Sequence, residues 1–141
     1  TGDLISPWAD VKMDVHDIPM DDNSFDVVIC NHVLEHVDDA HKVMTEFYRV
    51  MKPGGWGIFQ VPIDTNNPNT EEDKSVTDPK ERERLYWQDD HLRLFGLDYG
   101  KKLAAAGFKV TESDFINELS PELVERYALP KDEIVYFCQK L

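Results

Sequence analysis

The stretch FDVVIC at residues 25–30 is an apolar, β-branched run without alternation. Such a run is typical of a strand that is buried on both faces of a parallel sheet. From Asp38 onward the apolar residues recur at helical spacing. The turn PGG at residues 53–55 ends this helix, and WGIFQVP at residues 56–62 follows as a second strand. Strand, helix and strand form a βαβ unit, which predicts an α/β fold.

The rest of the chain completes one predicted domain. We expect a helix over residues 97–106, then a strand from Phe108 and an antiparallel last strand over residues 134–138. Residues 64–90 are rich in Asn, Pro, Thr and acids, and this composition is typical of a long loop. We therefore expect a single domain over residues 1–141, with residues 64–90 as a lid or substrate-side insertion.

Charge and composition limit the partners that the chain can bind. The 28 acidic residues outnumber the 15 basic ones and give a formal charge of −13, which repels nucleic acids and anionic membranes. No apolar run approaches the roughly 20 residues that cross a bilayer. The two cysteines, Cys30 and Cys138, lie in separate apolar runs and suggest no disulfide framework. We expect a cytoplasmic protein that acts on a small molecule, with no nucleic-acid or membrane partner.

The motif HVLEH at residues 32–36 matches H-x-x-E-H, a zinc-binding pattern of one class of metallopeptidases. On a helix, His32 and His36 would face the same way and Glu35 could act as a general base. However, the motif begins directly after a predicted strand and precedes the capped helix, so we place it on a loop. No third ligand is marked by its spacing. We expect no metal site, and a zinc hydrolase that uses His32 and His36 stays an alternative.

Four motifs together resemble one known family. They are DVHDIP at 14–19, DNSFDVV at 22–28, LEH at 34–36 and RVMKPGG at 49–55, and the likeness resumes at residues 91–110. As a set they resemble the second half of a class I S-adenosylmethionine-dependent methyltransferase of the methyltransferase type 11 group. The resemblance implies a Rossmann-like, mostly parallel sheet with an antiparallel C-terminal strand. It also implies S-adenosylmethionine as the cofactor.

The same resemblance assigns cofactor-binding residues at the carboxyl ends of the strands, where open parallel sheets bind ligands. Asp3 matches the acid that binds both ribose hydroxyls. Asp14 matches the acid that receives the adenine amino group, with the backbone N–H of Val15 near the ring. Asn31 and His32 match the loop that lines the methionine end of the cofactor, mostly through main-chain atoms.

Methyl transfer needs a base only if the acceptor loses a proton, and His32 and His91 are the candidate catalytic residues. By analogy His32 lies closest to the methyl group. His91, together with Arg93 in DHLRLF, resembles a family segment that contacts the acceptor, and it could equally form a structural hydrogen-bonding pair. The sequence does not specify the acceptor.

One family element, a strand followed by a glycine-rich loop, has no counterpart before residues 1–4 (TGDL), which match the end of the family's second strand. We therefore expect an N-terminally incomplete domain that binds the cofactor poorly or not at all. We also expect a homodimer, because an unpaired sheet edge recruits another strand. A non-catalytic α/β scaffold without cofactor is the alternative.

Overall fold

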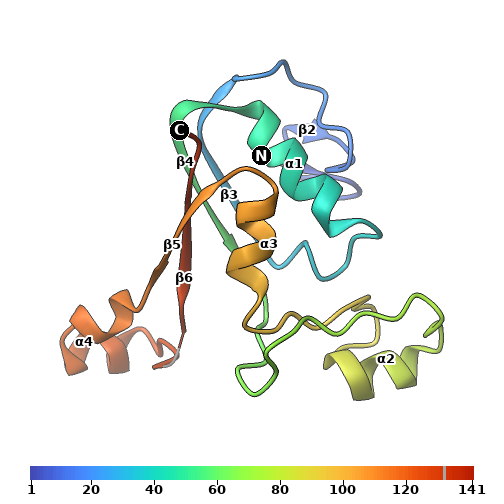
Figure 1. Cartoon of the computed structure of the whole chain (residues 1–141), viewed down its shortest axis with the longest axis vertical. Coiled ribbons are helices and arrows are strands. Elements are labelled where there is room, and N and C mark those ends of the chain that lie inside the picture. The colour runs from blue at the N-terminus through green and yellow to red at the C-terminus, as the bar shows by residue number, and fades with distance from the viewer. Residues whose placement is uncertain (132) are drawn as a thin grey trace.

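The larger of two β-sheets forms the centre of the computed structural model, which describes residues 1–131 and 133–141 (Figure 1). Its strand order is β3-β4-β6-β5. The strands are β3 (Phe25–Asn31), β4 (Met51–Gln60), β5 (Lys109–Ser113) and β6 (Val135–Gln139). β3 and β4 are parallel, whereas β6 is antiparallel to both of its neighbours. The predicted α/β fold with an antiparallel C-terminal strand is confirmed.

A smaller sheet holds the N-terminal strands β1 (Gly2–Asp3) and β2 (Val11–Lys12), which pair in parallel. Within the described residues this pair is not hydrogen-bonded to the larger sheet. The chain then enters β3 through a loop that Arg49 holds in place, because its guanidinium donates to the carbonyl oxygens of Ile18 and Met20.

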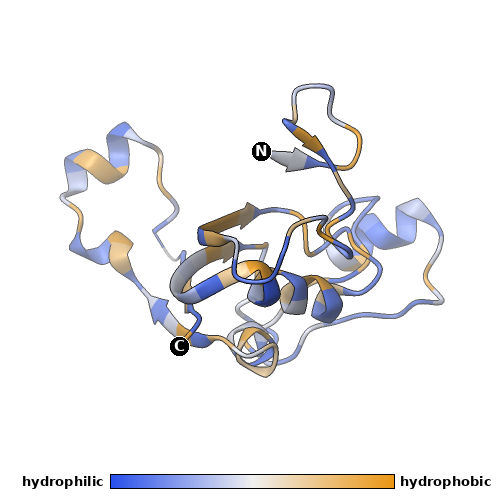
Figure 2. Ribbon diagram, turned by 90° about the horizontal axis from the view of Figure 1, so that it is seen from above, coloured by the Kyte–Doolittle hydropathy of each residue, from blue (hydrophilic) through white to orange (hydrophobic). Residues whose placement is uncertain are grey.

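In the part of the chain that the structure describes, four α-helices and a 3₁₀ helix connect the strands. They are α1 (Ala40–Val50), α2 (Pro79–Tyr86), α3 (Tyr99–Ala105), α4 (Pro121–Arg126) and the 3₁₀ helix η1 (Phe115–Glu118). Asp39 caps α1, since its side chain accepts a hydrogen bond from Lys42 N at 2.9 Å. α2 is mostly hydrophilic (Figure 2) and lies within the predicted 64–90 loop. Among the described residues, no helix is both long and apolar enough to cross a membrane.

The turn at residues 53–55 does not end α1 as predicted. The helix already ends at Val50, and β4 begins at Met51. Gly54 has φ +82° inside β4, where the pairing register shifts between Phe25 and Val27 of the partner strand. Gly54 thus permits the irregular backbone at the start of β4, because glycine adopts a positive φ more readily than other residues do.

The core lies on one face of the larger sheet, beneath α1 and α3, which contact each other. Aromatic rings join the layers, and Phe47 of α1 stacks on Phe59 of β4 with 5.0 Å between ring centroids. The buried hydroxyl of Tyr99 donates to the carbonyl oxygen of Phe59 at 2.9 Å. α3 is therefore anchored to the sheet by both packing and a hydrogen bond.

The opposite face of the sheet corrects one prediction. β3 is not buried on both faces, since Val27 and Ile29 are 39% and 62% exposed. Val28 and Cys30 do pack against the core. In the described residues no helix covers the outer face, and the outer edge of β3 has no strand partner. β3 therefore carries apolar side chains on both faces, but only the face with Val28 and Cys30 packs against the core.

Candidate functional site

A cleft of about 500 Å³ separates the small sheet from β3. This volume falls in the range of small-molecule sites, about 300–1,000 Å³. Of the predicted cofactor residues, Val15 and Asn31 line the cleft. Other lining residues are mostly apolar and include Met13, Ile18 and Val28. The cleft can therefore take a ligand with a substantial apolar surface along β3, from Phe25 to Asn31.

Asp3 is the last residue of β1, and Asp14 lies two residues after β2. Neither acid is among the residues that line the cleft, and each is held by its own loop. Asp3 Oδ1 accepts from the backbone N–H groups of Ile5 and Ser6, at 2.9 and 2.8 Å, and these bonds lower the pKa of Asp3. Asp14 Oδ1 accepts from the backbone N–H of His16 at 2.8 Å and lies 2.7 Å from its Nδ1, which lowers the pKa of Asp14. Within residues 1–131 and 133–141, no donor contacts Oδ2 of either carboxylate.

His32 forms the sharp turn at the end of β3. Its φ of 56° is uncommon for a residue with a side chain, and its N–H donates to Gln60 O at 2.8 Å. The His32 ring is 64% exposed and donates from Nδ1 to Glu35 Oε1 at 3.2 Å. Its backbone thus follows Asn31 at the cleft, but its side chain does not line the cleft.

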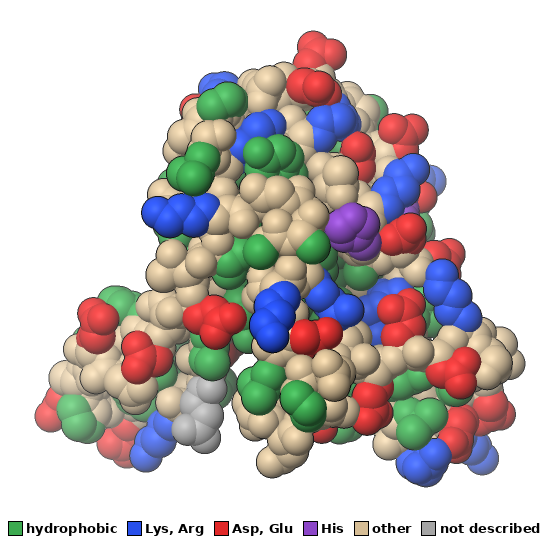
Figure 3. Space-filling view, in the orientation of Figure 1, with side chains coloured by type: hydrophobic (Ala, Val, Ile, Leu, Met, Phe, Trp, Pro, Cys, Tyr) green, Lys and Arg blue, Asp and Glu red, His purple; other side chains and the backbone are tan. Residues whose placement is uncertain are grey.

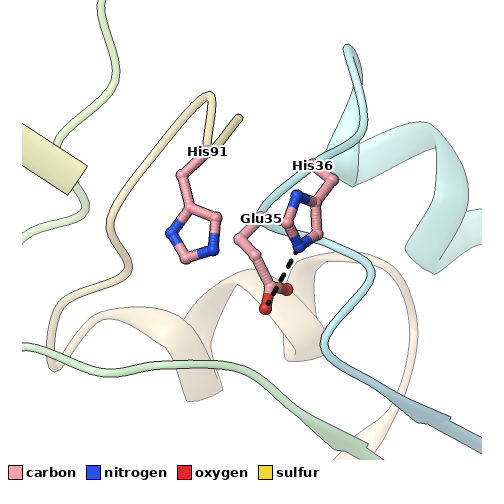
Figure 4. Close-up of side chains that lie close together, drawn as sticks. All are labelled: Glu35, His36 and His91. Carbon is pink, nitrogen blue, oxygen red and sulfur yellow. Dashed lines mark ion pairs between the residues drawn. The ribbon is translucent and has the colours of Figure 1, made fainter. Parts of the chain in front are cut away.

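His91 is buried away from the cleft, with 4% of its surface exposed. Its Nδ1 donates to the carbonyl oxygen of Tyr86 at 2.7 Å. The His91 ring lies edge-on to the ring of His36, with 4.7 Å between centroids. The structure therefore groups His91 with Glu35 and His36 and not with the cofactor candidates (Figure 4).

The segment HVLEH at residues 32–36 lies on a loop and not on a helix, and this confirms the prediction from the sequence. Arg93, which is 1% exposed, donates to the carbonyl oxygens of Leu34, Val37 and Asp38. It also pairs with Glu72 at 2.8 Å. The sequence left two roles open for the segment DHLRLF, namely contact with the acceptor and structural hydrogen bonding. These contacts favour the structural role for Arg93.

Sequence reasoning missed Glu35 as the centre of a cluster. Its side chain is 2% exposed and lies within 4.0 Å of both His32 and His36. The sequence features that could have indicated this cluster are the LEH motif and the histidine at position 91. Burial of the carboxylate, however, depends on loop packing that residue spacing does not reveal.

Comparisons with known proteins agree with this architecture. A family model described as a methyltransferase domain matches residues 6–59. The ubiquinone/menaquinone biosynthesis C-methyltransferase of Desulfotalea psychrophila is 48% identical over 55 residues, which are 39% of this chain and 21% of the relative. The matched segment thus spans about a fifth of the length of such curated relatives.

Two solved structures share the fold. The 1,6-didemethyltoxoflavin N1-methyltransferase of Burkholderia thailandensis, solved with S-adenosylhomocysteine bound, superposes with a TM-score of 0.63 and 15% identity, over 99% of this chain and 59% of that one. The geranyl diphosphate C-methyltransferase of Streptomyces coelicolor gives a TM-score of 0.57 and 13% identity, over 92% and 51% of the two chains.

S-adenosylhomocysteine is what remains of S-adenosylmethionine after methyl transfer, so the findings support S-adenosylmethionine as the cofactor of this class. The resemblance to class I methyltransferases is confirmed: residues 6–59 match a methyltransferase domain, and the chain has the Rossmann-like fold of this class.

Proposed function

We propose that the chain is part of an S-adenosylmethionine-dependent methyltransferase that acts on a small-molecule acceptor. The observation that supports this most is the cleft between the two sheets, which borders Val15 and Asn31 within the segment that matches the methyltransferase domain. Bound there, the cofactor would supply a methyl group already activated on sulfur. The protein then has to align donor and acceptor and exclude water.

The residues present fit such a ligand. A carboxylate can accept hydrogen bonds from two neighbouring hydroxyl groups, and Oδ2 of Asp3 is not contacted by any described residue. We propose that Asp3 binds the ribose hydroxyls and that Asp14, with the N–H of Val15, binds the adenine. Both acids have a lowered pKa, so they remain ionised and able to accept at neutral pH. Asn31 and the backbone of His32 would border the methionine end.

We propose His32 as the residue that takes a proton from the acceptor where the acceptor loses one. Its exposed ring follows Asn31 directly and is oriented by Glu35. His91 is a weaker candidate for this step, because it is buried and its Nδ1 is bonded to Tyr86. Residues 64–90 would cover the acceptor, since they follow β4 and pack back on residues 94–95.

The proposed partners follow from the surface. Acidic side chains are spread over the face drawn in Figure 3 among fewer basic ones, in keeping with the formal charge of −13. This charge disfavours a nucleic-acid acceptor. The relative from Burkholderia thailandensis binds a small heteroaromatic molecule by its name, and the relative from Streptomyces coelicolor binds an isoprenoid diphosphate. We propose a small organic acceptor without assigning its class.

Calorimetric titration with S-adenosylhomocysteine tests the proposal. We expect the wild-type chain to bind one equivalent, and Asp14→Ala to weaken binding at least tenfold because the adenine contact is lost. Asp17→Ala removes an exposed acid from the same motif and should bind as the wild type does. Unchanged affinity in Asp14→Ala would reject the assignment of Asp14. Failure of the wild type to bind would reject cofactor binding by this chain and favour a non-catalytic scaffold.

A further inference from the structure

Three side chains meet beside the loop that follows β3, outside the cleft between the sheets. Glu35, His36 and His91 each present one ligand atom, and these atoms lie within 4.8 Å of one another. Figure 4 shows one nitrogen of each ring directed toward the side of Glu35. Two of the residues come from the loop before α1, and the third comes from the segment after α2. The cluster thus joins chain segments that lie far apart in the sequence.

The carboxylate of Glu35 lacks a partner that it needs. Its side chain is 2% exposed, and Oε2 has no hydrogen-bond donor within the described part of the chain. Burying an ionised carboxylate without a compensating partner is unfavourable. Among the described residues, Oε1 has one hydrogen-bond partner, the exposed ring of His32 at 3.2 Å, and His36 Nε2 lies farther away at 4.0 Å. A positive ligand between Glu35 and the two other histidines would remove this cost.

Both histidines are oriented as metal ligands are. His91 Nδ1 donates to the carbonyl oxygen of Tyr86, which fixes the proton on Nδ1 and leaves the lone pair on Nε2. His36 Nδ1 lies 3.3 Å from Asp90 Oδ2, while its Nε2 lies 4.0 Å from Glu35 Oε1. Histidines that bind metal usually donate the other ring N–H to a carbonyl or carboxylate in this way.

We propose that Glu35, His36 and His91 bind a divalent cation of the zinc type. Two imidazole nitrogens and one carboxylate oxygen suit Zn²⁺ or Co²⁺, whereas Mg²⁺ prefers oxygen ligands throughout. Zinc ligands at 2.0–2.2 Å from the metal lie roughly 3.4 Å apart. Binding therefore draws the three atoms inward from separations of up to 4.8 Å. The fourth position is left for water or for an oxygen atom of a bound molecule.

This site differs from the H-x-x-E-H zinc site that the sequence suggested. His32 is not one of the three ligands, the motif is not on a helix, and the third ligand comes from residue 91. The expectation of no metal rested on the loop position of the motif and on the missing third ligand. The inference does not depend on the proposed function, although the cation would lie beside the loop that follows Asn31, the last residue of β3.

Titration of the purified chain with Zn²⁺ and with Co²⁺ tests the site. We expect one equivalent of Zn²⁺ by calorimetry, visible absorption bands on Co²⁺ binding, and a rise in the melting temperature with Zn²⁺. His36→Ala should lower the affinity at least a hundredfold and abolish the Co²⁺ bands. His41→Ala removes an exposed histidine from α1 and is the matched control, which should bind as the wild type does.

Two further variants distinguish loss of metal binding from loss of folding. His91→Ala opens a buried position, whereas Glu35→Gln keeps the shape of the side chain and removes its charge. Circular dichroism establishes that each variant is folded. We expect Glu35→Gln to be folded and to lose Zn²⁺ affinity at least tenfold. The proposal is overturned if the wild type binds no stoichiometric Zn²⁺, or if His36→Ala and Glu35→Gln bind it as the wild type does.

Discussion

Arg93 is the residue on which the loop after β3 depends. Its buried guanidinium donates to three carbonyl groups of residues 34–38 and pairs with Glu72. The neighbouring Leu92 N–H donates to Glu35 O at 2.8 Å. Residues 92 and 93 therefore hold the loop at several points. The positions of Glu35 and His36 follow from this clamp.

Replacing Arg93 should destabilise the fold. Arg93→Met keeps much of the side-chain volume but leaves three carbonyls and Glu72 without their donor. We expect a loss of about 3–5 kcal/mol in the free energy of unfolding. Arg84→Met, which breaks an exposed pair with Glu81, should cost less than about 1 kcal/mol. Urea unfolding of both variants measures the difference, and equal losses would contradict the clamp.

The histidines illustrate how far the sequence predicts a site. The motif at residues 32–36 and the histidine at position 91 were identified as chemically capable, and the loop position of the motif is confirmed. Their grouping was not predicted, because it depends on the segment after α2 folding back over residues 34–38. For Asp3, Asp14, Val15 and Asn31, the assignments to the cofactor stay predictions.

At the scale of elements, α1 is tied to the loop before β3 by Glu46 and Arg49, which pair with each other and each bond to that loop. Glu46 accepts from Arg49 at 2.8 Å and from the backbone N–H of Ile18 at 3.0 Å. Arg49 in turn reaches Asp22 and two loop carbonyls. The loop that leads from β2 to β3 is therefore fixed by the charged side of a helix whose other side is in the core.

This ion pair predicts a pH dependence of stability. The hydrogen bond from Arg49 lowers the pKa of Glu46 below its ordinary value of 4.5. The pair's contribution is therefore present above pH 4.5 and is lost as the pH falls through the lowered pKa. We expect Glu46→Gln to cost about 1–2 kcal/mol at pH 7 and much less at pH 3.

Chemical unfolding at both pH values, with Glu125→Gln as control, checks this prediction. Glu125 is exposed on α4, and its side chain makes no ion pair with a described residue. Glu125→Gln should behave as the wild type at both pH values. A loss from Glu46→Gln that is the same at pH 3 and pH 7 would contradict an ionic origin.

The elements that the sequence predicted are those with a strong hydrophobic pattern. α1 shows one apolar stripe, and β3 and β6 are mostly apolar runs. α4 and the 3₁₀ helix were not predicted, because they bury none of their residues and leave no periodic signal. The open face of β3 was not predicted either, because a run of apolar residues does not reveal whether a second layer covers it.

At the scale of the whole molecule, the described helices, in residues 1–131 and 133–141, cover one face of the larger sheet and leave the other open. Val27, Ile29, Trp56, Ile58 and Phe137 alternate with core residues and so point to the other face. Trp56 and Phe137 stack on each other there, with 5.5 Å between ring centroids. An apolar face beside an unpaired strand edge is prone to association.

We predict that two copies associate through this face. Light scattering at micromolar concentration should give the mass of two chains. Ile58→Lys, on the same face but outside the lining of the cleft, should reduce it to that of one chain because the charge would be desolvated in the interface. Leu141→Lys changes an exposed residue at the end of the chain and serves as control. A wild-type mass of one chain would contradict the prediction.

A crystal structure of the chain with S-adenosylhomocysteine tests the central claim most directly, namely that the cleft between the sheets binds the cofactor. The account predicts ligand density in this cleft, with the ribose at Asp3, the adenine at Asp14 and Val15, and the amino acid end at Asn31. Density for the ligand outside the cleft, or a cleft without ligand at saturating concentration, would contradict it.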